Sequence, residues 1–241
     1  MKIAFLGGGV YGDPIRKLLN KHFELVSPEN ADLLVVASYG KILKPEEYNK
    51  PKYGTVVAHP SLLPQYRGSS PVQYTLLNGD KITGVTIIQI DELVDHGAIL
   101  AQKELAVAPN DRFATLIARL AELSGEMLVK LIPKIERGEV MPVEQDHSKA
   151  TFTKKLTKED GKLALTKPAA ELARQVRAFW PWPGSFVWIE DQNGAKKRLL
   201  IHQVHIIDDN FIPDLVQLEG KKVMNFAEFT RGWRGKLPFT H

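Results

Sequence analysis

The run DLLVVA at Asp32–Ala37 is apolar at every position after its first residue. Such a run is typical of a strand buried on both faces of a parallel sheet, because a strand with one wet face alternates apolar and polar residues. A second run, KIAFL at Lys2–Leu6, leads into Gly7-Gly8-Gly9. A buried strand that passes through glycines into a helix is the opening of a nucleotide-binding type α/β fold.

The first helix is predicted over Asp13–Lys21, since Asp is favoured at the N-cap and Pro14 at the first helical position. The glycines before it serve any tight strand-to-helix turn, so we assign them a structural role in preference to a dinucleotide site. Only five residues separate Val26 from Asp32. A parallel crossover needs about a dozen residues, so we expect a reduced sheet with a short edge strand over Glu24–Val26.

Three further strands are predicted, over Gly54–Ala58, Gly84–Ile90 and Ala98–Leu105, and the last two should form a hairpin. Two further helices are predicted, over Ser70–Leu77 and Asp111–Arg137. The longer of these helices carries leucines and a methionine at helical spacing, which indicates a core-packing stripe. We expect it to close the first domain.

The character of the chain changes after residue 137. Residues 138–152 contain a proline and a polar run, and they are predicted as a linker. Residues 153–241 combine one helix, over about 168–179, with short β-rich runs that include the last twenty residues. This profile is typical of a small β-barrel. We therefore expect a first domain at 1–137, this linker, and a C-terminal domain at 153–241.

The composition is that of an ordinary globular protein, with 44% hydrophobic and 25% charged residues in 241. No apolar run approaches the ~20 residues of a membrane span, and the first strand passes into glycines instead of a signal-peptide core. We expect a cytoplasmic monomer. Cysteine is absent, and no pair of the seven histidines has a zinc-like spacing, so no metal site is expected.

The formal charge of +4 is unevenly distributed. Residues 1–150 hold 17 basic and 18 acidic side chains, whereas residues 151–241 hold 15 basic and 10 acidic ones. A basic module beside a nearly neutral one suits a polyanionic partner such as RNA. A solvated basic surface without a partner is the alternative interpretation.

Two polar motifs follow neighbouring predicted strands. HPSLLPQYRG begins at His59, and DHG begins at Asp95. Acyl transfer to an amine builds charge on the acyl oxygen while the incoming nitrogen loses a proton, so its site needs a hydrogen-bond donor, an imidazole and a carboxylate. His59 and Asp95 supply two of these parts, with Asp91 and Glu92 as alternative carboxylates. We interpret the pair as an acyl-transfer site.

This pair of motifs resembles the folate-dependent formyltransferases, whose signature is Asn-x-His-x-Ser-Leu-Leu-Pro followed by an Asp-x-Gly loop. The stretch RAFWPWPGSF at Arg177–Phe186 and ATFTKK at Ala150–Lys155 are similar to the C-terminal domain of the formyltransferases that act on methionyl-tRNA. That domain is an open oligonucleotide-binding (OB) type barrel. The resemblance thus implies a reduced Rossmann-like formyltransferase domain followed by an OB-like β-barrel domain.

The resemblance also implies a reaction, in which a formyl group passes from 10-formyltetrahydrofolate to the α-amino group of methionine on charged initiator tRNA. His59 would polarise the formyl oxygen or assist the proton shuttle, and Asp95 would serve as the ultimate base. The folate would contact two segments: Ser38, Tyr39 and Gly40, and Ser61, Leu62, Leu63 and Pro64. For tRNA phosphates we expect basic side chains without sequence preference, namely Lys154, Lys155, Lys158, Lys196, Lys197 and Arg198.

The chain departs from the family pattern in two places. Val57 stands where the family has Asn, and a valine side chain cannot form the hydrogen bond that an amide would give to the oxyanion. Candidate replacements are a backbone N–H, an ordered water or Gln89. The chain also lacks the long segment between the second and third strands, including the basic loop that grips the acceptor stem. The alternatives are a formyltransferase for an amino-sugar nucleotide, or a folate- or tRNA-binding protein without turnover.

Overall fold

The computed structural model describes residues 1–239. The chain divides into two compact units. The first unit comprises Met1–Val72, Asp80–Pro109 and Ala114–Lys155, and the second comprises Gln73–Gly79, Asn110–Phe113 and the chain from Leu156 onward. Residues 138–152 fall within the first unit by this division.

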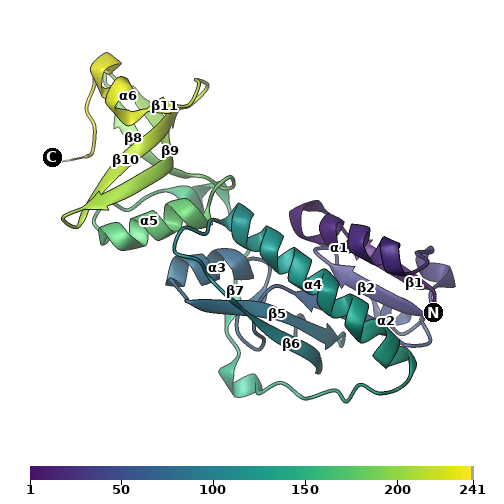
Figure 1. Cartoon of the computed structure of the whole chain (residues 1–241). Helices are drawn as coiled ribbons and strands as arrows, with labels where there is room; N and C mark the ends of the chain where they lie inside the picture. Colours follow the sequence, from purple (N-terminus) through teal and green to yellow (C-terminus); the bar gives the residue numbers. More distant parts are fainter. Residues whose placement is uncertain (240–241) are drawn as a thin grey trace. The chain divides into compact units, whose positions relative to one another are not determined.

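The first unit is built on a five-stranded mixed sheet (Figure 1). Its strands, in the spatial order β1-β2-β3-β5-β6, are β1 (Ile3–Gly7), β2 (Leu33–Ala37), β3 (Thr55–His59), β5 (Ile82–Gln89) and β6 (Ile99–Ala106). The first three are parallel, β5 is antiparallel to β3, and β5 and β6 form the expected hairpin. On the free side of β1 the predicted edge strand is reduced to a single parallel bridge between Leu25 and Ile3.

Two helices lie side by side across the strands in Figure 1, α1 (Gly9–His22) and α4 (Phe113–Glu136). Their contact is close, because the Tyr11 hydroxyl and the Ser124 hydroxyl are 2.6 Å apart and buried. The predicted leucine stripe of α4 is confirmed, with Leu116, Leu120, Leu123, Leu128 and Leu131 all buried.

The predicted start of the first helix is wrong, because α1 begins at Gly9 instead of Asp13. The Gly12 N–H already donates to the Gly8 carbonyl at 3.2 Å, so Pro14 lies inside the helix. The earlier start follows from packing. A Cβ on Gly7 would lie 1.7 Å from the Ala37 carbonyl oxygen, so only glycine lets the turn approach β2 this closely.

Short elements complete the first unit. They are the 3-10 helices η1 (Pro28–Asn30) and η2 (His147–Lys149), the helix α2 (Pro45–Tyr48), and the two-residue strands β4 (Arg67–Gly68) and β7 (Phe152–Thr153). β4 and β7 pair in parallel, so the predicted linker lies alongside the chain that follows His59. The helix α3 (Pro71–Asn78), most of which belongs to the second unit, agrees with the predicted helix to within one residue at each end.

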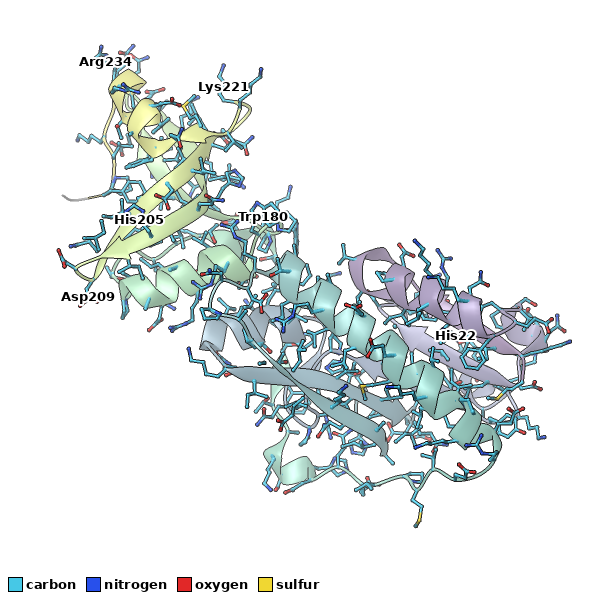
Figure 2. The ribbon with its side chains drawn as sticks, in the orientation of Figure 1. His22, Trp180, His205, Asp209, Lys221 and Arg234 are labelled. Carbon is cyan, nitrogen blue, oxygen red and sulfur yellow. The ribbon has the colours of Figure 1, made fainter. Side chains whose placement is uncertain are left out.

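The second unit contains an antiparallel sheet in the order β11-β10-β9-β8. Its elements are η3 (Lys158–Gly161), α5 (Ala169–Ala178), β8 (Ser185–Glu190), β9 (Lys196–Ile207), β10 (Asn210–Leu218), β11 (Met224–Asn225) and α6 (Phe226–Gly232). In Figure 2, Lys221 and Arg234 lie at the end of this unit away from α5. The predicted fold is a reduced Rossmann-like domain followed by an OB-like β-barrel domain. The structure confirms a Rossmann-like domain on a mixed sheet and a C-terminal domain of antiparallel strands.

The expectation that the last twenty residues are β-rich is wrong for the part up to residue 239, and residues 240 and 241 lie outside the described range. β11 has only two residues, and the helix α6 follows it directly. Phe226 and Phe229 explain the helix, because their i, i+3 spacing puts both rings on one face, and both are buried in the core of the second unit. The helix α5 and the strand β9 contribute to the same core, through residues such as Leu172 and Leu199.

Candidate active site

His59 and Asp95 come together in the first unit. His59 is the last residue of β3 and is 5% exposed, and its Nδ1 lies 3.5 Å from Oδ1 of Asp95. The strands before them are antiparallel, since His59 pairs with Thr86 and Val56 with Gln89. The chain therefore leaves β5 at the opposite end of β3 from His59. The contact depends on the 90–98 loop, which carries Asp95 back along β3.

The hydrogen bonding of His59 fixes its tautomer. Its Nε2 lies 2.9 Å from the carbonyl oxygen of Tyr66, which can only accept, so Nε2 carries the hydrogen. Nδ1, which then carries no hydrogen, faces the Asp95 carboxylate. The ring and the carboxylate attract each other when one of them holds a proton that the other can accept. The separation of 3.5 Å is long for a hydrogen bond. The two groups are therefore near enough to exchange a proton after a small approach of one towards the other.

The Asp95 carboxylate has a second partner. Its Oδ2 accepts a hydrogen bond of 2.7 Å from the backbone N–H of Gly68, and the side chain is 12% exposed. The backbone of Asp95 has a φ of 53°, in the left-handed region that few residues other than glycine adopt. Gly97 makes this loop possible, because a Cβ there would lie 1.8 Å from the Gln89 carbonyl oxygen. The loop is thus tightly packed and conformationally constrained.

The four predicted folate-contacting residues after His59 form a turn held by several hydrogen bonds. Ser61 is buried and its hydroxyl donates to the Gln65 carbonyl at 2.6 Å. The Thr86 hydroxyl donates to the Ser61 carbonyl and accepts from the Leu63 N–H. Leu63 is buried, while Leu62 and Pro64 are half-buried. Within this segment, only Leu62 and Pro64 therefore have side-chain surface to offer a ligand.

The second predicted folate segment follows β2. Ser38 and Gly40 have positive φ angles of 55° and 74°, which form a sharp turn with exposed ends. Tyr39 between them is half-buried and packs against the apolar cluster that includes Val36, as Val57 does. Because β2 and β3 are parallel, their carboxyl ends lie at one edge of the sheet. The turn is therefore close to the end of β3 that carries His59.

Val57 shares a face of β3 with His59, two residues further along. It pairs with Val36 of β2 and Ile88 of β5, so apolar residues flank it on both neighbouring strands. Gln89 cannot replace the missing amide. It pairs with Val56, three residues and about 10 Å from His59 along the strand.

Sequence reasoning missed a buried polar network beneath Asp95. Arg67 and Gln145 are 5% and 4% exposed, and Arg67 donates to the Gln145 side-chain oxygen from Nη2 at 2.6 Å and from Nε at 3.2 Å. Gln145 in turn donates to the backbone of the Asp95 loop. Gln145 stands in a polar run that predicts a linker, and no periodic or motif signal distinguishes it.

The six basic residues predicted to contact tRNA are divided between the two units. Lys154 and Lys155 follow β7 in the first unit, and the others belong to the second. Lys196 is exposed at the start of β9, whereas the Arg198 guanidinium lies 4.7 Å from the centre of the Phe186 ring. Arg198 is therefore partly engaged by aromatic packing.

The part of the chain that the structure describes contains no cluster of side chains suited to hold a metal ion. Within residues 1–239, no three His, Asp or Glu side chains gather as a metal ion would require. No helix in this range is both long and apolar enough to cross a bilayer.

Comparisons with known proteins agree with the fold and with the motifs. The family model described as formyl transferase matches residues 13–132, and the one described as formyl transferase, C-terminal domain, matches residues 155–214. The methionyl-tRNA formyltransferase of Myxococcus xanthus is 36% identical over 233 residues, which cover 86% of this chain and 73% of the relative. That of Anaeromyxobacter sp. is 43% identical over 159 residues, which cover 66% and 51%.

Two solved structures share the fold at lower identity. Methionyl-tRNA formyltransferase from Clostridium thermocellum superposes with a TM-score of 0.68 at 17% identity, covering 90% of this chain and 98% of that one. HypX from Aquifex aeolicus, in complex with tetrahydrofolic acid, gives 0.75 at 17% identity, covering 100% of this chain and 51% of that one.

Proposed function

The chain belongs to the formyl transferase family, and we propose that it transfers a formyl group from 10-formyltetrahydrofolate to the α-amino group of methionine on charged initiator tRNA. Relatives that carry the name methionyl-tRNA formyltransferase align over 84% to 86% of the chain, at 34% to 36% identity. The alignment includes the C-terminal module as well as the first domain. The observation that carries the proposal is the buried contact between His59 and Asp95.

His59 and Asp95 are proposed to share the proton transfer. As the amine nitrogen bonds to the formyl carbon, it must lose a proton, and Asp95 is the carboxylate placed to accept it, with His59 sharing that proton through Nδ1. The folate nitrogen that leaves takes up a proton, so the transfer releases none overall. The backbone N–H of Gly68 holds Asp95 in place during the exchange. Catalysis is then mainly a matter of positioning and charge stabilisation.

The formyl donor is proposed to lie along the face of β3 that carries Val57 and His59. Tyr39 and Val57 are both half-buried and pack against one apolar cluster, which includes Val36. We propose that this apolar surface accepts the flat ring of a pterin. Leu62 and Pro64 offer further apolar surface after His59. With Val57 in place of an amide, the oxyanion must rely on backbone N–H groups or water, so a low turnover is expected.

The acceptor is proposed to be an RNA because the chain from residue 151 onward has five more basic than acidic residues. Lys158 and Lys196 are exposed in the second unit, and Lys154 and Lys155 are exposed in the first. Lysine side chains bind phosphates without reading sequence. We propose that the protein is a monomer that meets charged tRNA in the cytoplasm. Its functional domains are proposed to be residues 1–137 and 153–241, joined by residues 138–152, which belong to the first compact unit.

The test is a formylation assay with two acceptors. Methionyl initiator tRNA and a nucleotide-linked amino sugar are each incubated with 10-formyltetrahydrofolate, and the formylated product is measured. Product on the tRNA alone is the expected result. Product on the sugar alone would show an amino-sugar formyltransferase, and tight binding of both substrates without product would show a non-catalytic homologue. His59→Ala should lower the rate by about 10²–10⁴-fold.

A further inference from the structure

We propose that Gln145 and Arg67 are positioning residues that clamp the loop carrying Asp95, an assignment that rests on the proposed function. Neither residue is among those proposed to contact the substrates. Gln145 bonds directly to the backbone of the loop from a segment 50 residues further along the chain, and Arg67 acts through Gln145. The clamp therefore joins the segment after α4 to the proposed active site.

Gln145 grips the loop on both sides of His96. Its side-chain nitrogen donates to the carbonyl oxygen of Asp95 at 3.0 Å and to that of Gly97 at 2.8 Å. Both amide hydrogens are thereby used, and the group is almost fully buried. A buried amide that makes two such bonds holds the peptide groups on either side of one residue, and so it fixes the backbone conformation between them.

Arg67 determines which way the Gln145 amide points. A guanidinium only donates, so the two bonds from Arg67 require the side-chain oxygen of Gln145 to face it. The nitrogen must then face the Asp95 loop. A flipped amide would place two donors against each other on one side and acceptors against carbonyl oxygens on the other. The orientation is therefore the only one that satisfies all four partners.

A pair of stacked histidines strengthens the clamp. Arg67 Nη2 also lies 2.8 Å from Nδ1 of His147, which must accept, so the hydrogen of that ring is on Nε2 and points to Glu144 at 3.0 Å. The His147 ring stacks on His96 with centroids 4.0 Å apart and 5° between the planes. His96 is in turn bonded to Asp91 at the start of the loop.

Arg67 also reaches the carboxylate through its neighbour. Gly68, next in the chain, donates its N–H to Oδ2 of Asp95. The backbone of Arg67 is fixed in turn by the Thr151 carbonyl at 2.8 Å, and β4 pairs with β7. One short segment, residues 145–153, thus supports both the loop that carries Asp95 and the Gly68 N–H that binds the Asp95 carboxylate. Asp95 is held in a left-handed conformation, which persists only where the surroundings dictate it.

The discriminating variant is Gln145→Glu. The new carboxylate keeps the shape and can still accept from Arg67, so the buried cation retains a partner and the fold should survive. It has no N–H, however, and one of its oxygens must face the two loop carbonyls. We expect kcat to fall by about 10²-fold, as for a misplacement of about 1 Å. KM for both substrates should stay within about threefold, since no substrate contact is lost. Gln192→Glu, on an exposed turn, is the matched control.

A second measurement does not depend on activity. The Gly68 amide hydrogen is bonded to Asp95, so its exchange with solvent reports whether the carboxylate is in place. In Gln145→Glu this amide should exchange at least about tenfold faster, while the control variant leaves it unchanged. If wild-type protein forms no product, the proposed function fails, and the exchange result still decides the clamp. Unchanged Gly68 exchange, or an unchanged kcat in an active enzyme, would overturn the clamp.

Discussion

Restoring the missing amide is expected to accelerate the reaction. Val57 and His59 are two residues apart on the same face of β3, so their Cα atoms are separated by about 6.6 Å. An acyl oxygen can be bracketed between side chains with this spacing. A single oxyanion donor contributes about 10²–10³ in turnover, or ~3–4 kcal/mol. Val57→Asn should therefore raise the single-turnover rate of formylation by about 10²-fold.

Val57→Asn should also lower the free energy of unfolding, and the size of this loss can be bounded. Val57 is half-buried among apolar neighbours, including Val36 and Ile88, so a polar side chain there should lower the free energy of unfolding by about 1–3 kcal/mol. A domain with the usual 5–15 kcal/mol remains folded.

The assay is quenched-flow formylation of methionyl initiator tRNA, together with a thermal melt of each variant. Val57→Leu, which adds no donor, is the control and should give no gain. An unchanged or lower rate in a folded Val57→Asn protein would refute the reasoning, because it would show that another donor already serves the oxyanion.

Three further predictions concern packing, charge and RNA contacts. Gly97→Ala should lower the free energy of unfolding, measured by denaturant titration, by about 3 kcal/mol or more, since its Cβ would lie 1.8 Å from a carbonyl oxygen. Gly232→Ala is the control and should be nearly neutral, because its Cβ would meet nothing within 4 Å. Equal effects of the two changes would contradict the packing argument. The hydrogen bond from Lys149, with that from Ser148, lowers the pKa of Asp146 to about 2, so its stabilisation should be present above the ordinary value of 3.8 and be lost as the pH falls towards 2. Lys149→Ala should move the pKa, followed by NMR, back towards 3.8, and no movement would exclude the lysine as the cause. Lys196→Ala should weaken binding to any RNA sequence alike and reduce the salt-dependence slope by roughly 1, whereas a sequence-dependent loss would point to base recognition.

Much of the sheet follows from local pattern. The apolar run at Asp32–Ala37 becomes a fully buried strand, β2, because a strand covered on both faces has no place for polar residues. The leucine stripe of α4 is likewise set by its own spacing. By contrast, the start of α1 depends on how closely Gly7 approaches Ala37, a contact that spans 30 residues and leaves no local signal.

The candidate site was also predictable in part, where its residues belong to local sequence motifs. His59 and Asp95 sit in recognisable motifs, and they do meet. That β5 runs antiparallel to β3 is not encoded in either strand's own residues, so the dependence of Asp95 on its loop could not be inferred. Gln145 bonds residues about 50 positions away and Arg67 one 78 away. Contacts of this range appear only once the chain is folded.

The proposed proton acceptor can be tested by removing one charge without changing its shape. Asp95→Asn keeps an oxygen for the Gly68 N–H and suits the left-handed backbone at this position, so the loop should hold its form. The decisive measurement is the single-turnover yield of formyl-methionyl-tRNA from this variant beside wild type. We predict that wild type forms product and that Asp95→Asn loses at least about 10²-fold in rate. Equal rates from the two proteins would contradict the assignment of Asp95 as the base.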